Sequence, residues 1–409
     1  MRPIITHFTD NDLYTFTCQY YILQKYPRAE VEYTFFDRNR SKYPKGFDSL
    51  LRQHVDNMAN VIITDEEINF MKEKCYFLPK WYIEVFLKGY RFNPNEVTIT
   101  QDEEGYLDIK IKGKWYSTIM WEMPILSTIS ELMHQLNGDW EHRYNLGEEY
   151  YKSLNKARRI LSNELTLADM GTRRRFSFEH QDMVIKSFMD AIKEGGWTEN
   201  GVFKPWTGKF IGTSNVYFAM KYDLTIVGTM SHQIVSFEET VSGVFECNYN
   251  TMNKWSEVYD GANGIFLYDC FGANAFFNNL SKRMAMLYSG LRVDSGVEEE
   301  QVELIINKYA SLGINAKNKQ IVFSNGLNID RAIEIHNHVK GRVIDSYGMG
   351  THLTCDVTDC KPMNIVIKLT KGRITENREW HDCVKLSCDK GKTLGNEMKC
   401  AYLTATLNP

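Results

Sequence analysis

The sequence predicts an α/β fold built around a β/α barrel, and the second half of the chain carries the observations behind this prediction. Short apolar strands recur there, each followed by a turn rich in Gly, Ser or Thr and then by a helical pattern, which is typical of a parallel sheet. Six such units are found, at 210–215, 224–232, 265–272, 291–296, 321–326 and 343–350. Their spacing of about 15 to 40 residues fits a barrel whose chemistry lies where the strands end. A doubly wound open sheet is the alternative that this periodicity leaves open.

The elements outside these units follow from local patterns. Residues 31–36 and 106–111 have the apolar alternation of strands, and the second of these suits a sheet with one solvated face. Residues 125–162 are predicted to be helical. Residues 298–312 place apolar side chains on one helix face, and Asn328 is positioned to cap the helix that follows it.

Composition limits the class of ligand. The 409 residues carry a net charge of −4, so no global basic field attracts nucleic acid or anionic lipid. A polyanionic substrate would need a local cluster of Arg and Lys. The N-terminus lacks an apolar signal core and no apolar run reaches membrane-spanning length, so we expect a cytoplasmic protein without a membrane partner.

The nine cysteines are predicted to be reduced thiols. Cys355 and Cys360 are five residues apart, as are Cys383 and Cys388, so four thiolates are a candidate zinc set. Structural zinc sites use tighter pairs, which favours free thiols and no metal held by the protein.

Two glycine turns are candidates for a phosphate site. The segment 348–351 and the pair Asn325–Gly326 offer backbone amides that can approach a phosphate closely, with a helix N-terminus behind them. Tight turns also use Gly without binding anything. Two such turns after adjacent strands favour a monophosphate cradle.

An arginine run, 173–175, follows the apolar segment 165–170. Arginine runs are usually solvated, but a run that leaves a buried element is a natural bidentate partner for pyrophosphate.

Arg292 and Asp294 occupy alternate positions at a strand end, so their side chains point the same way. They either form an ion pair without chemistry, or Arg292 meets an anionic ligand while Asp294 holds a ribose hydroxyl or a magnesium-bound water. His232, just past another strand, is a nucleophile, an acid/base or a buried hydrogen-bonding residue. No Ser-His-Asp or Cys-His signature supports acyl-enzyme hydrolysis.

Taken together and in this order, these segments resemble the nicotinate phosphoribosyltransferase family essentially end to end. The segments that carry the resemblance are 10–14, 29–33, Arg38, 171–176, 212–215, 228–232, 292–296, 323–328, 346–354, 361–369 and 384–387.

The resemblance implies a type II phosphoribosyltransferase, with an irregular β/α barrel at 126–364 beside an α/β domain formed by 1–125 and 365–409. It implies a homodimer with a shared active site, and synthesis of nicotinate mononucleotide and pyrophosphate from nicotinate and phosphoribosyl pyrophosphate (PRPP) in NAD synthesis. ATP would be a co-substrate, and Mg²⁺ would accompany pyrophosphate without being caged by the protein.

Roles are also implied residue by residue. Tyr14 and Arg38 would reach the site from the neighbouring subunit, to stack on the pyridine ring and to contact PRPP phosphates. By resemblance, Arg173 matches an arginine that contacts the ligand phosphates. Arg292 and Asp294 match residues that contact the ribose and the pyridine ring. His232 matches the histidine that ATP phosphorylates. The other residues implied to bind substrate are Met170, Thr213, Ser214, Asn325, Gly326, Gly348, Gly350 and Thr351.

Ser214 bears on the choice of pyridine. Related enzymes that use nicotinamide carry Asp at this position, which suits an amide and repels a carboxylate, so a neutral Ser favours nicotinic acid. Met170 stands where the family commonly has an aromatic residue. Carboxylates common in the family are neutral here, at Gln233, Val297, Asn325 and Asn328. Nicotinamide as substrate, another PRPP-linked base, and an inactive PRPP-binding homologue are the alternatives.

Overall fold

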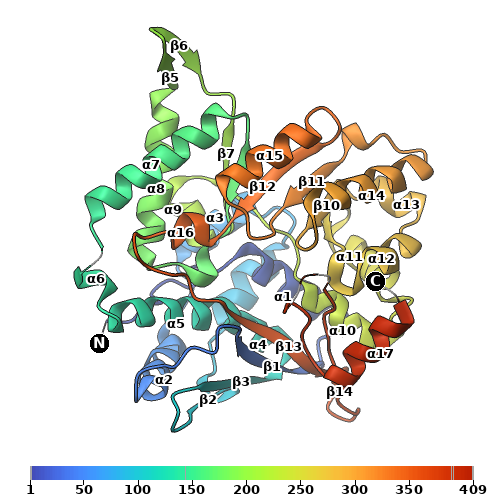
Figure 1. Cartoon of the computed structure of the whole chain (residues 1–409). Coiled ribbons are helices and arrows are strands. Elements are labelled where there is room, and N and C mark those ends of the chain that lie inside the picture. The colour runs from blue at the N-terminus through green and yellow to red at the C-terminus, as the bar shows by residue number, and fades with distance from the viewer. Residues whose placement is uncertain (1, 143, 388, 390, 408–409) are drawn as a thin grey trace.

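A computed structural model of the chain describes residues 2–142, 144–387, 389 and 391–407 and contains two large sheets (Figure 1). The larger is a parallel sheet of seven strands. In chain order they are β4 (Thr166–Asp169), β7 (Lys209–Thr213), β8 (Thr225–Ile226), β9 (Ile265–Leu267), β10 (Gly290–Val293), β11 (Gln320–Phe323) and β12 (Ile344–Met349).

The order of these strands decides between the two predicted architectures. The sheet runs β8-β7-β4-β12-β11-β10-β9, so the first strand, β4, pairs with the last, β12. Followed from β4, the strands succeed one another around a ring in chain order, with the opening between β8 and β9. The Thr229 hydroxyl spans this opening by donating to the Ile265 carbonyl at 2.8 Å. The α/β fold with an irregular barrel is therefore confirmed, and the doubly wound sheet is excluded.

Two predicted turns are partly strand. β12 continues to Met349, so Gly348 pairs with Ala168 of β4 instead of forming the turn predicted after Ile344. Likewise Gly212 and Thr213 belong to β7. At Gly348 a glycine is needed for close packing, because a Cβ there would lie 2.3 Å from the Met170 sulfur.

Helices follow the strands around the outside of the barrel (Figure 1). Helix α14 confirms the prediction at 298–312, and the Asn328 side chain accepts from the Arg331 amide and caps α15 as predicted. These outer helices are α7 (Leu146–Ser162), α8 (Phe178–Glu194), α9 (Val216–Tyr222), α10 (His232–Ser242), α11 (Cys247–Tyr259), α12 (Ala273–Asn279), α13 (Lys282–Leu287), α14 (Glu298–Ser311), α15 (Ile329–Val339) and α16 (Thr351–Thr354).

The second sheet is antiparallel, with the order β14-β13-β1-β3-β2. β13 (Ile365–Arg373) pairs with β1 (Glu30–Asp37), so both ends of the chain contribute to it. Its other strands are β2 (Val97–Gln101), β3 (Leu107–Lys114) and β14 (His381–Asp382), which confirms the strands predicted at 31–36 and 106–111. The domain boundaries at 125/126 and 364/365 stay predictions.

Further helices accompany this sheet: α1 (Leu13–Lys25), α2 (Phe47–Asn57), α3 (Asp65–Lys74), α4 (Trp115–Thr118), α5 (Glu122–Leu136) and α17 (Glu397–Leu407). The helical prediction for 125–162 holds except for a break after α5, where Gly138 has a φ of 72° and the short α6 (Asp139–His142) begins. A hairpin of β5 (Gly196–Glu199) and β6 (Val202–Pro205) projects beyond α8 (Figure 1).

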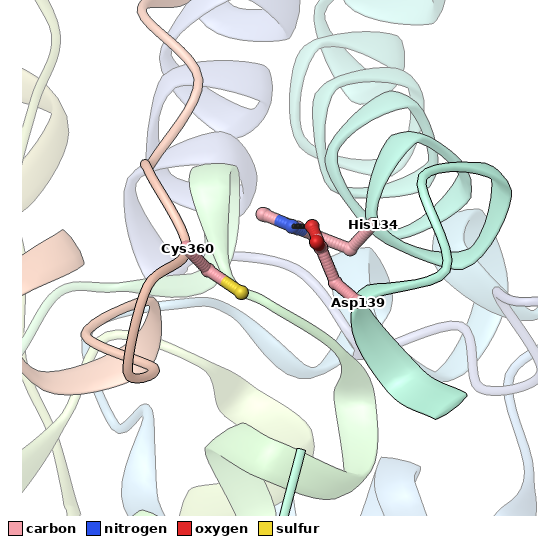
Figure 2. Close-up of side chains that lie close together, drawn as sticks. All are labelled: His134, Asp139 and Cys360. Carbon is pink, nitrogen blue, oxygen red and sulfur yellow. Dashed lines mark hydrogen bonds and ion pairs between the residues drawn. The ribbon is translucent and has the colours of Figure 1, made fainter. Parts of the chain in front are cut away.

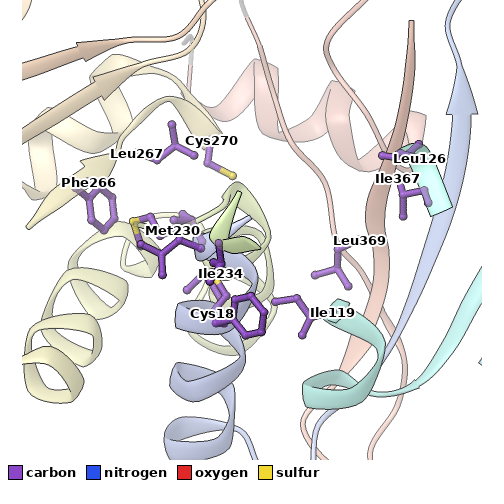
Figure 3. Packing of buried hydrophobic residues seen from close by; sticks show 14 of the residues in the cluster. Cys18, Ile119, Leu126, Met230, Ile234, Phe266, Leu267, Cys270, Ile367 and Leu369 are labelled. Carbon is purple, nitrogen blue, oxygen red and sulfur yellow. The ribbon is translucent and has the colours of Figure 1, made fainter. Parts of the chain in front are cut away.

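The two sheets share one hydrophobic core. Figure 3 shows Ile367 and Leu369 of β13 in the same cluster as Met230 and Ile234 at the start of α10. The antiparallel sheet is thereby fixed against the barrel. Among the described residues, no helix is long and apolar enough to cross a membrane.

Candidate active site

A cavity of about 220 Å³ lies where the barrel strands end, and residues following six of these strands line it. The convergence of strand-end turns that the sequence predicted is observed. The predicted residues on its wall are Tyr14, Met170, Arg173, Ser214, His232, Arg292, Asp294, Gly326, Gly348, Gly350 and Thr351.

Three predicted residues, Arg38, Thr213 and Asn325, do not line the cavity. Thr213 is fully buried, and its hydroxyl donates to the Asp169 carboxylate at 2.8 Å, so it supports the wall from behind. The Asn325 side chain bonds to Lys392 and to the carbonyl of Gly296, which turns it toward the C-terminal segment. A direct substrate contact by either side chain is therefore not supported by this geometry.

Tyr14 and Arg38 lie near the cavity of their own chain, and their predicted reach into the site of a neighbouring subunit stays a prediction. Tyr14 lines the cavity, and its hydroxyl donates to Glu122 at 2.9 Å. Arg38 lies off the wall but close enough to Arg173 for their charges to interact, and its buried Nε has no hydrogen-bond partner in the described part of the chain.

The arginine run divides between substrate cavity and core. Arg173 and Arg174 line the cavity, whereas Arg175 is 0% exposed and forms a bidentate ion pair with Asp10 at 2.7 Å. Only two of the three guanidinium groups are therefore available to a ligand.

Cations outnumber anions in the part of the cavity around Arg173 and Arg174. Burial, together with the positive charges of Arg173 and Arg38, lowers the pKa of Arg174. Burial also lowers the pKa of Lys368 to about 8, against the attraction of Glu122. Glu122 lies 3.6 Å from both Arg173 and Lys368, so one carboxylate serves two cations. A polyanion bound here would relieve this repulsion.

Arg292 and Asp294 form an ion pair at 3.7 Å and both line the cavity. The Ser324 hydroxyl donates to Asp294 at 2.8 Å. Although burial opposes ionisation, Arg292 and Lys385 lower the pKa of Asp294 to about 2. The buried Nε of Arg292 has no hydrogen-bond partner among the described residues, and the residue itself lines the cavity.

His232 is the first residue of α10 and is held by Asp269, whose carboxylate lies 2.8 Å from Nε2. A carboxylate accepts only, so Nε2 carries the proton and Nδ1 keeps its lone pair. Burial and the charge of Lys385 lower the pKa of His232 to about 4, so the imidazole is neutral at neutral pH. Burial alone would raise the pKa of Asp269. The neighbouring Lys385 and His232 instead hold this pKa well below its usual range. The site therefore offers a neutral imidazole nitrogen at a helix N-terminus, where anions are stabilised.

Beside these cations lies a stretch of the wall that carries an aromatic ring. It is formed by Tyr14, Met170 and Ser214, whose hydroxyl donates to Asp12 at 2.8 Å. Burial raises the pKa of Asp12 to about 6.

Sequence reasoning missed several charged residues of the site. Their segments did carry signals: Asp269 begins the turn after β9, and the lysines lie in the 361–369 and 384–387 segments. The residues missed are Asp12, Glu122, Asp269, Lys368 and Lys385.

Three of the four neutral replacements, Gln233, Asn325 and Asn328, have structural partners. Gln233 accepts hydrogen bonds from Tyr33 and, at 3.1 Å, from the Trp115 indole. Asn328 caps α15, a task that Asp performs equally well. Val297 precedes α14 and is half exposed, and its side chain makes no cap.

Comparison with known proteins supports one family. The family model described as "Nicotinate phosphoribosyltransferase (NAPRTase) family" matches residues 165–404, and the corresponding N-terminal domain model matches residues 9–130. The nicotinate phosphoribosyltransferase of Desulforapulum autotrophicum is 37% identical over 99% of both chains, and that of Chromohalobacter salexigens is 35% identical over 95% of this chain and 94% of its own.

Solved structures agree. The crystal structure of nicotinate phosphoribosyltransferase from Porphyromonas gingivalis has a TM-score of 0.91 at 37% identity, covering 99% of this chain and 100% of that one. The enzyme from Vibrio cholerae has a TM-score of 0.86 at 25% identity, covering 99% and 94%. With the strand-end cavity and its cations, these matches show that the chain belongs to the nicotinate phosphoribosyltransferase family.

Proposed function

We propose that this chain transfers the phosphoribosyl group of PRPP to nicotinate, giving nicotinate mononucleotide and pyrophosphate for NAD synthesis, with ATP as a stimulating co-substrate. The observation that carries the proposal is a single cavity at the strand ends that is lined by Arg173, Arg174, Arg292 and Lys368 together with the Tyr14 ring. The names of the relatives support the choice of substrates.

The reaction needs little covalent chemistry from the protein. The bond from C1 of the ribose to the pyrophosphate oxygen breaks and its electron pair leaves with pyrophosphate. The lone pair of the pyridine nitrogen forms the new bond to C1, and no proton has to be removed. Catalysis is then positioning and charge stabilisation. Arg173, Arg174 and Lys368 would hold the phosphates, and the backbone around Gly348 and Gly350 would hold the 5′-phosphate.

The residues of the cavity would hold Mg²⁺ only together with the phosphates of the substrate. Nitrogen and oxygen atoms of His232, Asp269 and Asp294 lie within 4.8 Å of one another. Asp269 is already committed to His232 and Ser295, which leaves Asp294 as the carboxylate available to an ion. Mg²⁺ prefers oxygen ligands and phosphates, so it would arrive with pyrophosphate and neutralise its charge. A homodimer with a shared site also stays a prediction.

The first test is a product assay by mass spectrometry. Nicotinate, PRPP and Mg²⁺ should give nicotinate mononucleotide, and ATP should increase the rate. The same assay with nicotinamide distinguishes the two pyridines. Product formed only from nicotinamide would overturn the assignment of nicotinate as the substrate. Tight PRPP binding without any product would indicate an inactive homologue.

Replacing Ser214 by aspartate is expected to lower kcat/KM for nicotinate by about 100-fold, because a carboxylate beside Asp12 repels an anionic ring substituent. The neutral Ser214→Asn variant has nearly the same shape as the aspartate variant and should keep most of the activity. Initial rates over a range of nicotinate concentrations measure both. Equal losses in the two variants would mean that size, and not charge, decides at this position.

A further inference from the structure

A second cluster of reactive side chains lies outside the cavity wall. It combines His134 at the end of α5, Asp139 at the start of α6, and Cys355 and Cys360 in the loop after α16. Figure 2 shows three of them, with the Cys360 sulfur directed toward the pair formed by His134 and Asp139. Segments more than 200 residues apart in sequence meet here, as the contact of His134 with Cys355 shows.

The hydrogen bonds prepare the imidazole as a ligand. His134 Nδ1 lies 2.8 Å from the Asp139 carboxylate, so Nδ1 donates and Nε2 keeps its lone pair. Nε2 lies 3.4 Å from the Cys355 sulfur. A carboxylate that orients a histidine through its second nitrogen is the usual support of a histidine ligand to zinc.

One pair of ligand atoms already has the separation of a tetrahedral centre. Zinc bonds of about 2.0 Å to nitrogen and 2.3 Å to sulfur at tetrahedral angles separate the two ligand atoms by roughly 3.6 Å. The observed separation of 3.4 Å between His134 Nε2 and Cys355 Sγ is close to that edge. The Cys360 sulfur lies within 4.8 Å of ligand atoms of both His134 and Asp139. The ligand atoms of His134, Cys355 and Cys360 do not all lie within this separation of one another, so the Cys360 side chain has to rotate to reach the same centre.

We propose that His134 Nε2, Cys355 Sγ and Cys360 Sγ bind one zinc ion, with Asp139 holding the imidazole and a fourth position left for water or an Asp139 oxygen. Two thiols and one imidazole are the soft and borderline ligands that select zinc over Mg²⁺. Both thiols would release their protons to solvent on binding. The proposal differs from the four-cysteine site weighed above. Cys383 lies near Lys399 and Glu239, away from His134, and Cys388 lies outside the described residues.

The surroundings suit a structural metal site. His134 is buried and its ring lies 4.6 Å, centre to centre, from that of Phe176. Phe176 belongs with Cys355 and Val357 to a small apolar cluster separate from the main core, against which Trp140, Tyr144 and Cys360 pack. A cross-link here would stabilise a part of the fold that the main core does not reach.

The same segments support the substrate cavity. The Phe176 amide donates to the Thr354 carbonyl at 2.7 Å, and the Thr354 hydroxyl donates to the Gly171 carbonyl at 2.9 Å. The loop that carries Arg173 and the loop that carries Gly350 are thus bonded to each other directly beside Cys355. Zinc would fix both phosphate-binding loops to α5, whose first residue, Glu122, lies on the cavity wall.

The test is metal content and ligand chemistry in the full-length protein without a histidine tag. Protein produced with added zinc should retain about one zinc per chain after gel filtration, measured by mass spectrometry of the metal. The Cys360→Ala variant, changed at a partly exposed position, should retain less than about a fifth of that amount. Cys75→Ala removes a thiol that ends α3, outside the cluster, and should retain the wild-type amount.

Cobalt identifies the ligands without relying on a variant that folds. Metal-free wild type titrated with Co²⁺ should develop a sulfur-to-cobalt charge-transfer band and the strong visible bands of a tetrahedral centre. The Cys360→Ala variant should lose most of this absorption. Zinc should also raise the thermal midpoint of the wild type and not of that variant.

Any of three results would overturn the proposal: wild type without zinc and without the cobalt–sulfur band, equal zinc in the Cys360→Ala variant, or a Cys355–Cys360 disulfide in the isolated protein. Metal content does not depend on the pyridine substrate. A failure of the zinc proposal is therefore distinguishable from a failure of the proposed reaction.

Discussion

Replacing Arg292 by alanine is expected to lower kcat/KM for nicotinate mononucleotide synthesis by about 1,000-fold. The change removes a guanidinium that lines the cavity and whose buried Nε has no hydrogen-bond partner among the described residues. It also leaves the Asp294 carboxylate without its nearest cation, in a buried place where substrate phosphates must bind. Both effects weaken the binding of the substrate phosphates and of the departing pyrophosphate. Steady-state rates over ranges of PRPP and nicotinate measure the loss.

The matched control is Arg292→Lys, which keeps a positive charge but loses the planar guanidinium fork. It should recover part of the activity, whereas a surface change such as Arg283→Ala should have no effect. Thermal unfolding of each variant separates a loss of function from a loss of fold. An Arg292→Ala enzyme within tenfold of wild type would show that the ion pair with Asp294 is only structural.

The strand-end residues could be predicted because their placement follows from a repeating pattern. Once alternating strands and helices predict a barrel, residues that follow strands, such as Asp294 and Ser214, must gather at one end. Periodicity could not exclude a doubly wound sheet, since both architectures alternate in the same way. The pairing of β4 with β12 is a contact between distant segments, and only the structure supplies it.

The second wall of the site could not be predicted from local pattern. Lys368 lies within β13, and nothing in the strand itself says that its side chain faces the barrel mouth. That placement depends on the pairing of β13 with β1, more than 300 residues away in sequence. The sequence places Gly348 in a turn because glycine is common in turns. Close packing with Met170 instead requires a glycine at this position within a strand.

Replacing His232 by alanine is expected to abolish the stimulation by ATP while leaving slow synthesis without ATP. The ratio of rates with and without ATP should fall to about one, because the neutral imidazole nitrogen that would accept the phosphoryl group is lost. The cations that hold the PRPP phosphates are separate residues and remain. Parallel product assays with and without ATP, together with detection of ADP, measure the ratio.

The position of His232 explains why ATP would act through it. A phosphoryl group on Nδ1 adds about two negative charges at the N-terminus of α10, close to Lys385. In Asp269→Asn the imidazole remains but loses the carboxylate that fixes its proton on Nε2, so this variant should show reduced stimulation and not a complete loss. Equal losses with and without ATP in His232→Ala would contradict the phosphoryl role. The histidine would then serve the transfer step itself, through its 3.9 Å approach to Asp294.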